Sequence, residues 1–330
     1  NVEARERLFL DEDVIRARQF YLKELKGGEN VRKVCIINYA MNMEKFVPEG
    51  LEKADIGIIH SRAEKVMDKA RIKEADFVNP YGQETIDRDL EKVRRHEKEF
   101  EHNTNEYTRE QKAVADIFEA LVLENGELSD WFGPNAITHK TSKYDDYENG
   151  VDAVIEFQSE MSGAASFLGL AADVSFSTDT SEKFDRLKAG ILKGRLPQVK
   201  YFNSSDGYFH GRLNMIPEVV IGASKQTVLE LAELWQFKRN KELATHRIQI
   251  MILNQMEEQM EVFAKFAELN GQDEIARLYR DRLQIIKDIL DGKGDIAKEA
   301  TKFRTKDLVH EGIMDFLKHW KMEMEKEANL

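Results

Sequence analysis

The sequence predicts a mixed fold of the α+β or α/β class, in which a mixed-sheet α/β core is flanked by helical regions at both ends. Three observations predict it. The 330 residues include only 5 prolines and 19 glycines, and so few breakers favour long helices over a many-stranded sandwich. Short runs rich in β-branched and aromatic residues gather in the middle third of the chain. From residue 240 onward, apolar residues recur at helical spacing.

The first region, residues 1–104, is mostly helical in pattern. Residues 12–25 have an amphipathic face, and residues 33–39 form a short apolar run that fits either a strand or a buried helix turn. Ten of the thirteen residues in 87–99 are charged, five of each sign. Such mixed charge supports a solvated helix through pairs four residues apart. The sequence Asn103-Thr104-Asn105 indicates a break, and we place a domain boundary there.

The second region, residues 105–239, is expected to be the α/β core. Thr108 and Gln111 form a capping box that predicts the start of a helix. Ser181 is expected to begin a second helix, which ends near Gly194, and Ser224 is expected to cap a third. The strands are predicted from β-branched and aromatic content. Their ranges are 151–157, 167–176, 199–202 and 216–221.

The third region, residues 240–330, is expected to be a helical hairpin or bundle. Turns at 270–271 and 291–294 separate its helices. Methionine is a flexible side chain that fills irregular cores and adaptable binding surfaces. One face of the first of these helices has a stripe of apolar side chains, Met251, Met256, Met260 and Phe263. This stripe is therefore expected to be core, or a surface that binds a protein partner or a second copy of the chain.

Composition excludes several classes of protein. The 61 acidic and 49 basic residues give a net charge of −12, which does not fit a simple basic coat for nucleic acid, although a local basic patch remains open. The single cysteine, Cys35, rules out an intramolecular disulfide and a multi-cysteine zinc site. The cytoplasm or another reducing compartment is therefore expected. No signal peptide or membrane-spanning run is expected, and so no membrane partner. P-loop, dinucleotide-binding, zincin and nucleophile-elbow motifs are absent from the sequence.

Two aspartates lie in or beside the predicted strands. Asp152 leads into an apolar strand, and Asp173 lies inside the next one. A carboxylate in such a run is costly to bury unpaired, and hard divalent cations take oxygen ligands. Both are expected to bind Mg²⁺ or Mn²⁺, with Glu119 of the preceding helix as a third ligand. Asp145 and Asp146 are expected to be loop residues, with Asp146 as a reserve ligand. Alternatively, Asp152 is a turn residue and Asp173 belongs to an ordinary ion pair.

At these residues the sequence resembles the PD-(D/E)XK, or restriction-endonuclease-like, nuclease superfamily. That family has an α-β-β-β-α-β core, an Asp entering the second strand and an acidic-x-Lys motif on the third. The resemblance covers about residues 106–204, roughly a third of the chain, and its motif is short. Asn149-Gly150-Val151-Asp152 is similar to the family's Gly-x-Asp step. Asp152 and Asp173 would be the metal ligands. Glu119 is similar to an acidic residue that some members supply from the first helix, with Glu110 and Asp116 as rivals.

The resemblance implies Mg²⁺- or Mn²⁺-dependent phosphodiester hydrolysis of DNA or RNA, or a decayed relative that only binds nucleic acid. Ser175 stands where the family has the lysine that orients or deprotonates the attacking water. Some members supply this amine from the following helix, where Lys183 and Lys188 are available. The expected catalytic set is Asp152, Asp173, Ser175, Lys183 and Lys188.

A local basic patch accompanies the two aspartates. Residues 181–200 contain six basic and two acidic side chains, and further lysines lie beside the Asp152 strand. A basic rim around an acidic pocket would suit nucleic acid, whereas the alternative is a solvated helix face. The residues expected to bind nucleic acid are Lys140, Lys143, Arg186, Lys193 and Arg195. The alternative function is a non-catalytic structural or assembly protein that binds its partner, or itself, through residues 240–330.

Overall fold

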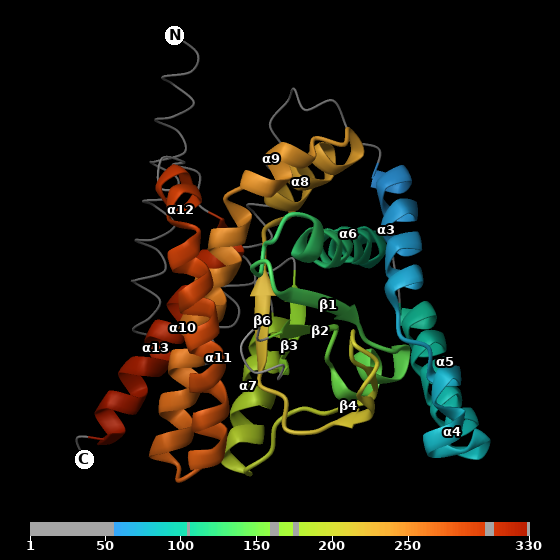
Figure 1. Ribbon diagram of the computed structural model, residues 1–330, viewed down its shortest axis with the longest axis horizontal. Helices are drawn as coiled ribbons and strands as arrows, with labels where there is room; N and C mark the ends of the chain where they lie inside the picture. The colour runs from blue at the N-terminus through green and yellow to red at the C-terminus, as the bar shows by residue number, and fades with distance from the viewer. Residues whose placement is uncertain (1–55, 104–105, 159–164, 174–177, 301–306, 329–330) are drawn as a thin grey trace.

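The computed structural model describes residues 56–103, 106–158, 165–173, 178–300 and 307–328. Of Asp173 only the backbone is described. The predictions for 12–25, for 33–39 and for Ser175 lie outside the described residues. The expected mixed α+β class is confirmed, since helices surround a mixed four-stranded sheet (Figure 1). None of the described helices is long and apolar enough to cross a membrane.

The main sheet has the strand order β1-β2-β3-β6. β2 is antiparallel to both of its neighbours, whereas β3 and β6 are parallel and are connected through α7. A separate antiparallel pair, β4-β5, is inserted between α7 and β6. The strands of the main sheet are β1 (Ala136–Lys140), β2 (Ala153–Gln158), β3 (Ala165–Asp173) and β6 (Glu218–Gly222). The inserted pair consists of β4 (Val199–Asn203) and β5 (His210–Leu213).

Helices from both ends of the chain pack around this sheet (Figure 1). α6 packs on β1 and β3, and α3 packs on α6. α10 lies along β6 and packs against α7, α11 and α13. The helices before the sheet are α3 (Ile56–Ala70), η1 (Glu74–Phe77), α4 (Val78–Tyr81), α5 (Gln83–Asn103) and α6 (Glu106–Leu128). Those within the core are η2 (Asp145–Asn149), α7 (Thr178–Leu192) and α8 (Lys225–Gln236). The remaining ones are α9 (Asn240–Thr245), α10 (Ile248–Leu269), α11 (Asp273–Gly292), α12 (Gly294–Ala300) and α13 (Leu308–Ala328).

One hydrophobic cluster contains residues from all three predicted regions. Met67 of α3, Ile155 of β2 and Met260 of α10 all belong to it. Met256, Met260 and Phe263 are fully buried in this cluster. These three side chains of the stripe on α10 are therefore part of the core. They cannot form the partner-binding surface that was the alternative prediction from the sequence.

The helix starts differ from those predicted. α6 begins at Glu106, so the expected capping box at Thr108 is wrong, because that residue lies inside the helix. α7 begins at Thr178, three residues before Ser181. In both cases residues upstream of the cap signal are themselves able to continue a helix. The cap at Ser224 is confirmed, since its side chain accepts a hydrogen bond from the backbone N–H of Thr227.

Side chains, rather than a fifth strand, bind the outer edge of β6. The amide of Gln259 accepts from the backbone N–H of Val220 at 2.8 Å and donates to the carbonyl of the same residue at 2.7 Å. The amide of Gln255 does the same for Gly222, at 2.8 and 2.9 Å. Both glutamines belong to α10 and are fully buried. They satisfy edge groups that would otherwise be unpaired in the protein interior.

Candidate functional site

The turn between β1 and β2 holds two adjacent aspartates in different surroundings. The carboxylate of Asp145 is fully buried and accepts hydrogen bonds from the Ser142 hydroxyl (2.8 Å) and the Asn149 amide (2.6 Å). It also accepts from the backbone N–H groups of Lys200 (2.7 Å) and Tyr201 (3.0 Å) in β4. Burial raises the pKa of Asp145, and these donors act in the opposite direction. Asp145 therefore joins the turn to β4 and is fully occupied in doing so.

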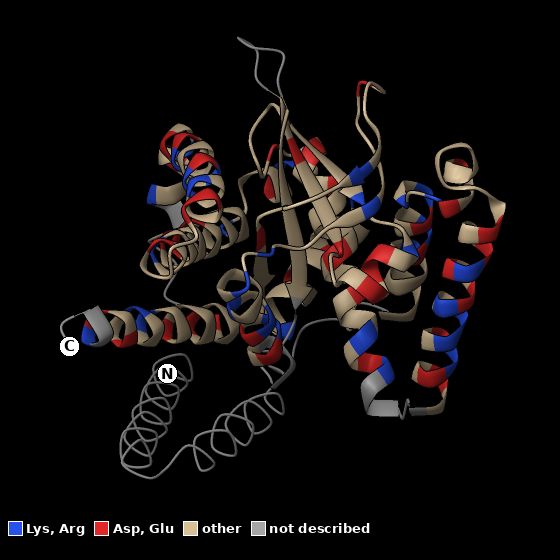
Figure 2. Cartoon of the chain, turned by 90° about the horizontal axis from the view of Figure 1, so that it is seen from below, with Lys and Arg blue, Asp and Glu red and all other residues tan. Residues whose placement is uncertain are grey.

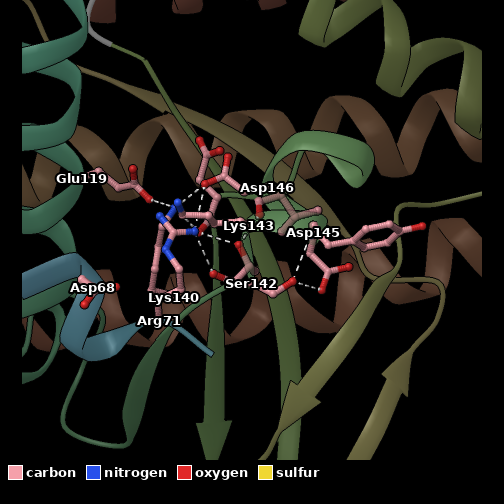
Figure 3. Close-up of polar contacts among 12 residues, drawn as sticks. Asp68, Arg71, Glu119, Lys140, Ser142, Lys143, Asp145 and Asp146 are labelled. Atoms are coloured by element: carbon pink, nitrogen blue, oxygen red, sulfur yellow. Dashed lines mark hydrogen bonds and ion pairs between the residues drawn. The ribbon is translucent and has the colours of Figure 1, made fainter. Parts of the chain in front are cut away.

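Asp146 belongs instead to a cluster around the buried ammonium group of Lys140 (Figure 3). Lys140 forms an ion pair with Glu119 of α6 and a second with Asp146, at 2.9 Å. Its Nζ also donates to the backbone carbonyl of Asp152 at 3.0 Å. Nη1 of Arg71, which follows α3, lies 3.3 Å from the carboxylate of Asp146. We call these five residues the Lys140 cluster.

The charges in the Lys140 cluster give its carboxyl groups different proton affinities. Burial raises the pKa of Glu119 to about 7, because Lys140 only partly offsets it and the charges of Asp152 and Asp146 add to it. Burial and the charge of Asp146 also raise the pKa of Asp152. Burial alone would raise the pKa of Asp146, but Lys140 and Arg71 together lower it. Perturbed carboxyl groups side by side are typical of functional sites, although structural ion-pair networks also have them.

The sequence left three acidic residues of the first helix as possible members of the site. Glu110 lies at the surface, where it pairs with Lys225. Asp116 pairs with Lys112 and lies 2.8 Å from a ring nitrogen of His60. Of these three, Glu119 alone pairs with a member of the Lys140 cluster.

Asp152 and Lys183 both contact the peptide groups of Ala172. The carboxylate of Asp152 accepts a hydrogen bond from the backbone N–H of Ala172 at 2.7 Å. The Nζ of Lys183, on α7, donates to the Ala172 carbonyl at 3.1 Å. The next residue along β3 is Asp173, whose backbone pairs with Gly222 of β6. The structure thus brings Asp152, Lys183 and position 173 to the same end of the sheet.

Four of the other residues that were expected in the site lie elsewhere or have partners. The Nζ of Lys188 lies 5.0 Å from the ring centre of Trp320, away from the Lys140 cluster. Lys143 is exposed and pairs with Glu97 at 2.5 Å. Lys193 and Arg195 are exposed at the end of α7.

Lys140 and Arg186 correct the expectation of a basic rim. Lys140 is 1% exposed, so it is an internal counter-ion instead of a rim residue. Arg186 forms an ion pair with Glu218 of β6 at 2.8 Å. The sequence could not show either partner, because the acidic residues that neutralise these cations come from other elements.

The sequence analysis missed two members of this region and gave a third only a minor place. Asp146 was only a reserve ligand, and Arg71 and Glu218 were not considered. Arg71 lies 75 residues before its partner Asp146, and no local pattern marks it. Glu218 did carry a signal, since a lone carboxylate precedes the apolar run of β6.

The donor chemistry around Asp152 suits a hard divalent cation, because every acidic group there supplies oxygen. Among the side chains that the structure describes, no group of three or more His, Cys, Asp or Glu is arranged to hold a metal ion. Glu119 and Asp146 are instead bound to Lys140. Of the three ligands expected from the sequence, this leaves Asp152 and Asp173, and the side chain of Asp173 lies outside the described part of the structure.

Comparison of the chain with protein-family models, with curated proteins and with solved structures found no match.

Proposed function

We propose that the protein is a divalent-metal-dependent phosphodiesterase that acts on nucleic acid and has a core of the PD-(D/E)XK type. One observation carries the proposal. The carboxylate of Asp152 and the amine of Lys183 both bind the peptide groups of Ala172, directly before Asp173. The resemblance implies the same set: two acidic residues on neighbouring strands and an amine from the following helix.

The order of elements supports the proposal. α6, β1, β2, β3, α7 and β6 follow each other in the order α-β-β-β-α-β, with the β4-β5 pair inserted before the last strand. The four strands are adjacent in chain order, and only the last pair is parallel. This agrees with the order that the resemblance implies.

Each residue then has a distinct role. Asp152 and Asp173 would hold Mg²⁺ or Mn²⁺, and the ion would supply an acidified water and neutralise charge on the phosphoryl group. Lys183 stands in for the lysine that Ser175 replaces, and orients the attacking water. The Lys140 ammonium binds the backbone carbonyl of Asp152 and so fixes the start of β2. Glu119, in its ion pair with Lys140, orients that lysine and is not itself a ligand in this arrangement.

Nucleic acid is the substrate class that the resemblance implies, and two exposed basic side chains after α7 are compatible with it. Lys193 and Arg195 are exposed and stay candidates for phosphate contacts. Figure 2 shows basic and acidic residues intermixed over the helices. Lys193 follows Lys183 by ten residues, roughly 15 Å along a helix, so the two exposed basic side chains would contact the substrate backbone at a distance from Asp152, as a local contact and not a broad basic coat.

The test is cleavage of supercoiled DNA, single-stranded DNA and RNA with Mg²⁺, with Mn²⁺ and with chelator. We expect metal-dependent cleavage by the wild type and its loss in Asp152→Asn, by about 100-fold or more, because the variant lacks a charged ligand. The matched control is Asp185→Asn, the same substitution at an exposed position of α7, which should leave the rate unchanged.

Wild-type rates of cleavage in Asp152→Asn, or cleavage by the wild type in the presence of chelator, would overturn the proposal. The structural or assembly function finds no support in the buried stripe of α10. It would be favoured by a wild type that cleaves nothing and whose mass in light scattering rises with concentration.

A further inference from the structure

Arg186 connects three elements near the start of β2. Its Nη1 donates to the carbonyl of Asn149 at 3.2 Å, and its Nη2 donates to the carbonyl of Gly150 at 3.3 Å. Nη2 also donates to the carboxylate of Glu218 at 2.8 Å. A planar guanidinium presents five donors in a fixed fork, so two of its nitrogens can bind two carbonyls and a carboxylate at once. Arg186 thus joins α7, β6 and the end of the turn that precedes Asp152.

Gly150 makes the close approach of this guanidinium possible. Its φ of +69° is a conformation that residues with a Cβ rarely adopt. A Cβ atom at position 150 would lie 1.7 Å from Nη1 of Arg186. The two residues after Gly150 are Val151, which is fully buried, and Asp152. Gly150, whose carbonyl binds Arg186, is therefore only two residues before Asp152.

Glu218 is an unusual partner for a partly exposed arginine. It is fully buried at the first position of β6, next to Gly169 of β3. One carboxylate oxygen binds Arg186, and the other has no hydrogen-bond partner among the described residues. A buried ion pair with an unsatisfied oxygen is a poor source of stability, because desolvation offsets most of the attraction. A pair that contributes little to stability points to another role.

We infer that Arg186 and Glu218 are positioning residues that hold the turn at Asn149 and Gly150, and through it the carboxylate of Asp152, in place beside β3. The inference rests on the proposed function for what Asp152 does. It removes Arg186 from the residues that bind nucleic acid directly, because its donors are directed at the chain's own carbonyls and carboxylate.

The first test compares Arg186→Met with the wild type in cleavage kinetics. In Arg186→Met the carboxylate of Asp152, a proposed metal ligand, should be misplaced. This should lower kcat by up to about 100-fold and leave KM for nucleic acid nearly unchanged. A phosphate-binding arginine would do the reverse, raising KM and making it less dependent on salt. A rise in KM alone would overturn the inference, as would unchanged kinetics.

A second readout does not need nuclease activity. Hydrogen exchange of the amides at 150–152 should become faster by about tenfold or more in Arg186→Met, while the amides of α10 keep wild-type exchange. Unchanged exchange at 150–152 would contradict the inference even if cleavage fell. If the wild type cleaves no nucleic acid, the proposed function fails, and the exchange result alone decides the role of Arg186.

Two substitutions of Glu218 separate positioning from a direct role. Glu218→Gln keeps a carbonyl oxygen for Arg186, and its amide nitrogen replaces the oxygen that has no partner. It should retain near-wild-type kcat and exchange. Glu218→Leu removes the acceptor and should behave like Arg186→Met. Loss of cleavage in Glu218→Gln with normal exchange would show a direct catalytic or ligand role and overturn the positioning role.

Discussion

At the scale of single residues, Lys140 is the cation that gathers the acidic side chains near Asp152. Its ammonium group is buried and contacts Glu119, Asp146 and a backbone carbonyl. Buried ion pairs are weak evidence for net stability, but removing one partner leaves uncompensated charge inside the protein. The cluster is therefore expected to be sensitive to loss of the lysine.

Lys140→Met should lower the free energy of unfolding by about 3–5 kcal/mol, because Glu119 and Asp146 lose their shared counter-ion in the interior. Lys143→Met is the matched control. Lys143 is exposed and pairs with Glu97, so its loss should cost about 1 kcal/mol or less. Urea denaturation of both variants checks this. Equal small losses would contradict the buried contacts of Lys140.

The sequence could indicate Asp152 and Lys183, because a carboxylate entering a strand and a lysine on the following helix are local features. It favoured Asp146 over Asp145 as a reserve ligand only because Asp146 is nearer to Asp152 in the sequence. These neighbours are chemically identical, and only the turn directs one to β4 and the other to Lys140. Arg71 reaches the cluster by tertiary packing alone.

At the scale of elements, the outer edge of β6 depends on α10. Two buried glutamine amides bind the backbone of Val220 and Gly222 in place of another strand. This keeps β6, and with it Glu218, at a fixed place in the sheet. Four hydrogen bonds in the interior also fix the position of α10 along the strand.

Gln259→Leu should destabilise the protein by about 2–4 kcal/mol, because it leaves the N–H and the carbonyl of Val220 buried without partners. Gln284→Leu is the control: Gln284 is exposed on α11 and bonds only a neighbouring side chain, Asp288. It should change stability by about 0.5 kcal/mol or less. The check is thermal unfolding of both variants side by side. Similar melting temperatures for the two would mean that the amide contacts are not made.

Elements with strong apolar content could be predicted, and those without it could not. The runs at 199–202 and 216–221 overlap β4 and β6 closely. β5 was missed because His210–Leu213 has one buried residue in four and no apolar pattern. Helix starts were displaced because cap residues such as Thr108 also occur inside helices.

At the scale of the whole molecule, the regions before and after the sheet both take part in the core, and the region before it also supplies Arg71 to the Lys140 cluster. α10 supplies Met256 and Met260 to the same cluster as β2 and α3. Composition and breaks in pattern placed boundaries at 104 and 239, and these boundaries stay predictions. Local signals could not reveal a hydrophobic cluster that all three regions share.

The charged helix α5 also contacts the site region. Lys92 forms an ion pair with Glu148 of η2 at 3.2 Å, and His96 lies 2.7 Å from the same carboxylate. Glu97 pairs with Lys143 of the turn. The net charge of −12 does not show where the charged residues pair. On α5, which the sequence predicted to be a solvated helix, one face binds the turn that carries Asp146.

The proposed function depends on a divalent cation bound between Asp152 and Asp173. Anomalous diffraction from crystals grown with Mn²⁺ tests it most directly, because it locates the ion without any assumption about the substrate. We predict one strong peak with carboxylate oxygens of both residues at about 2.0–2.6 Å, and no peak there in Asp152→Asn crystals. A saturating Mn²⁺ concentration that gives no peak at Asp152, or a peak that persists in the variant, would contradict the claim.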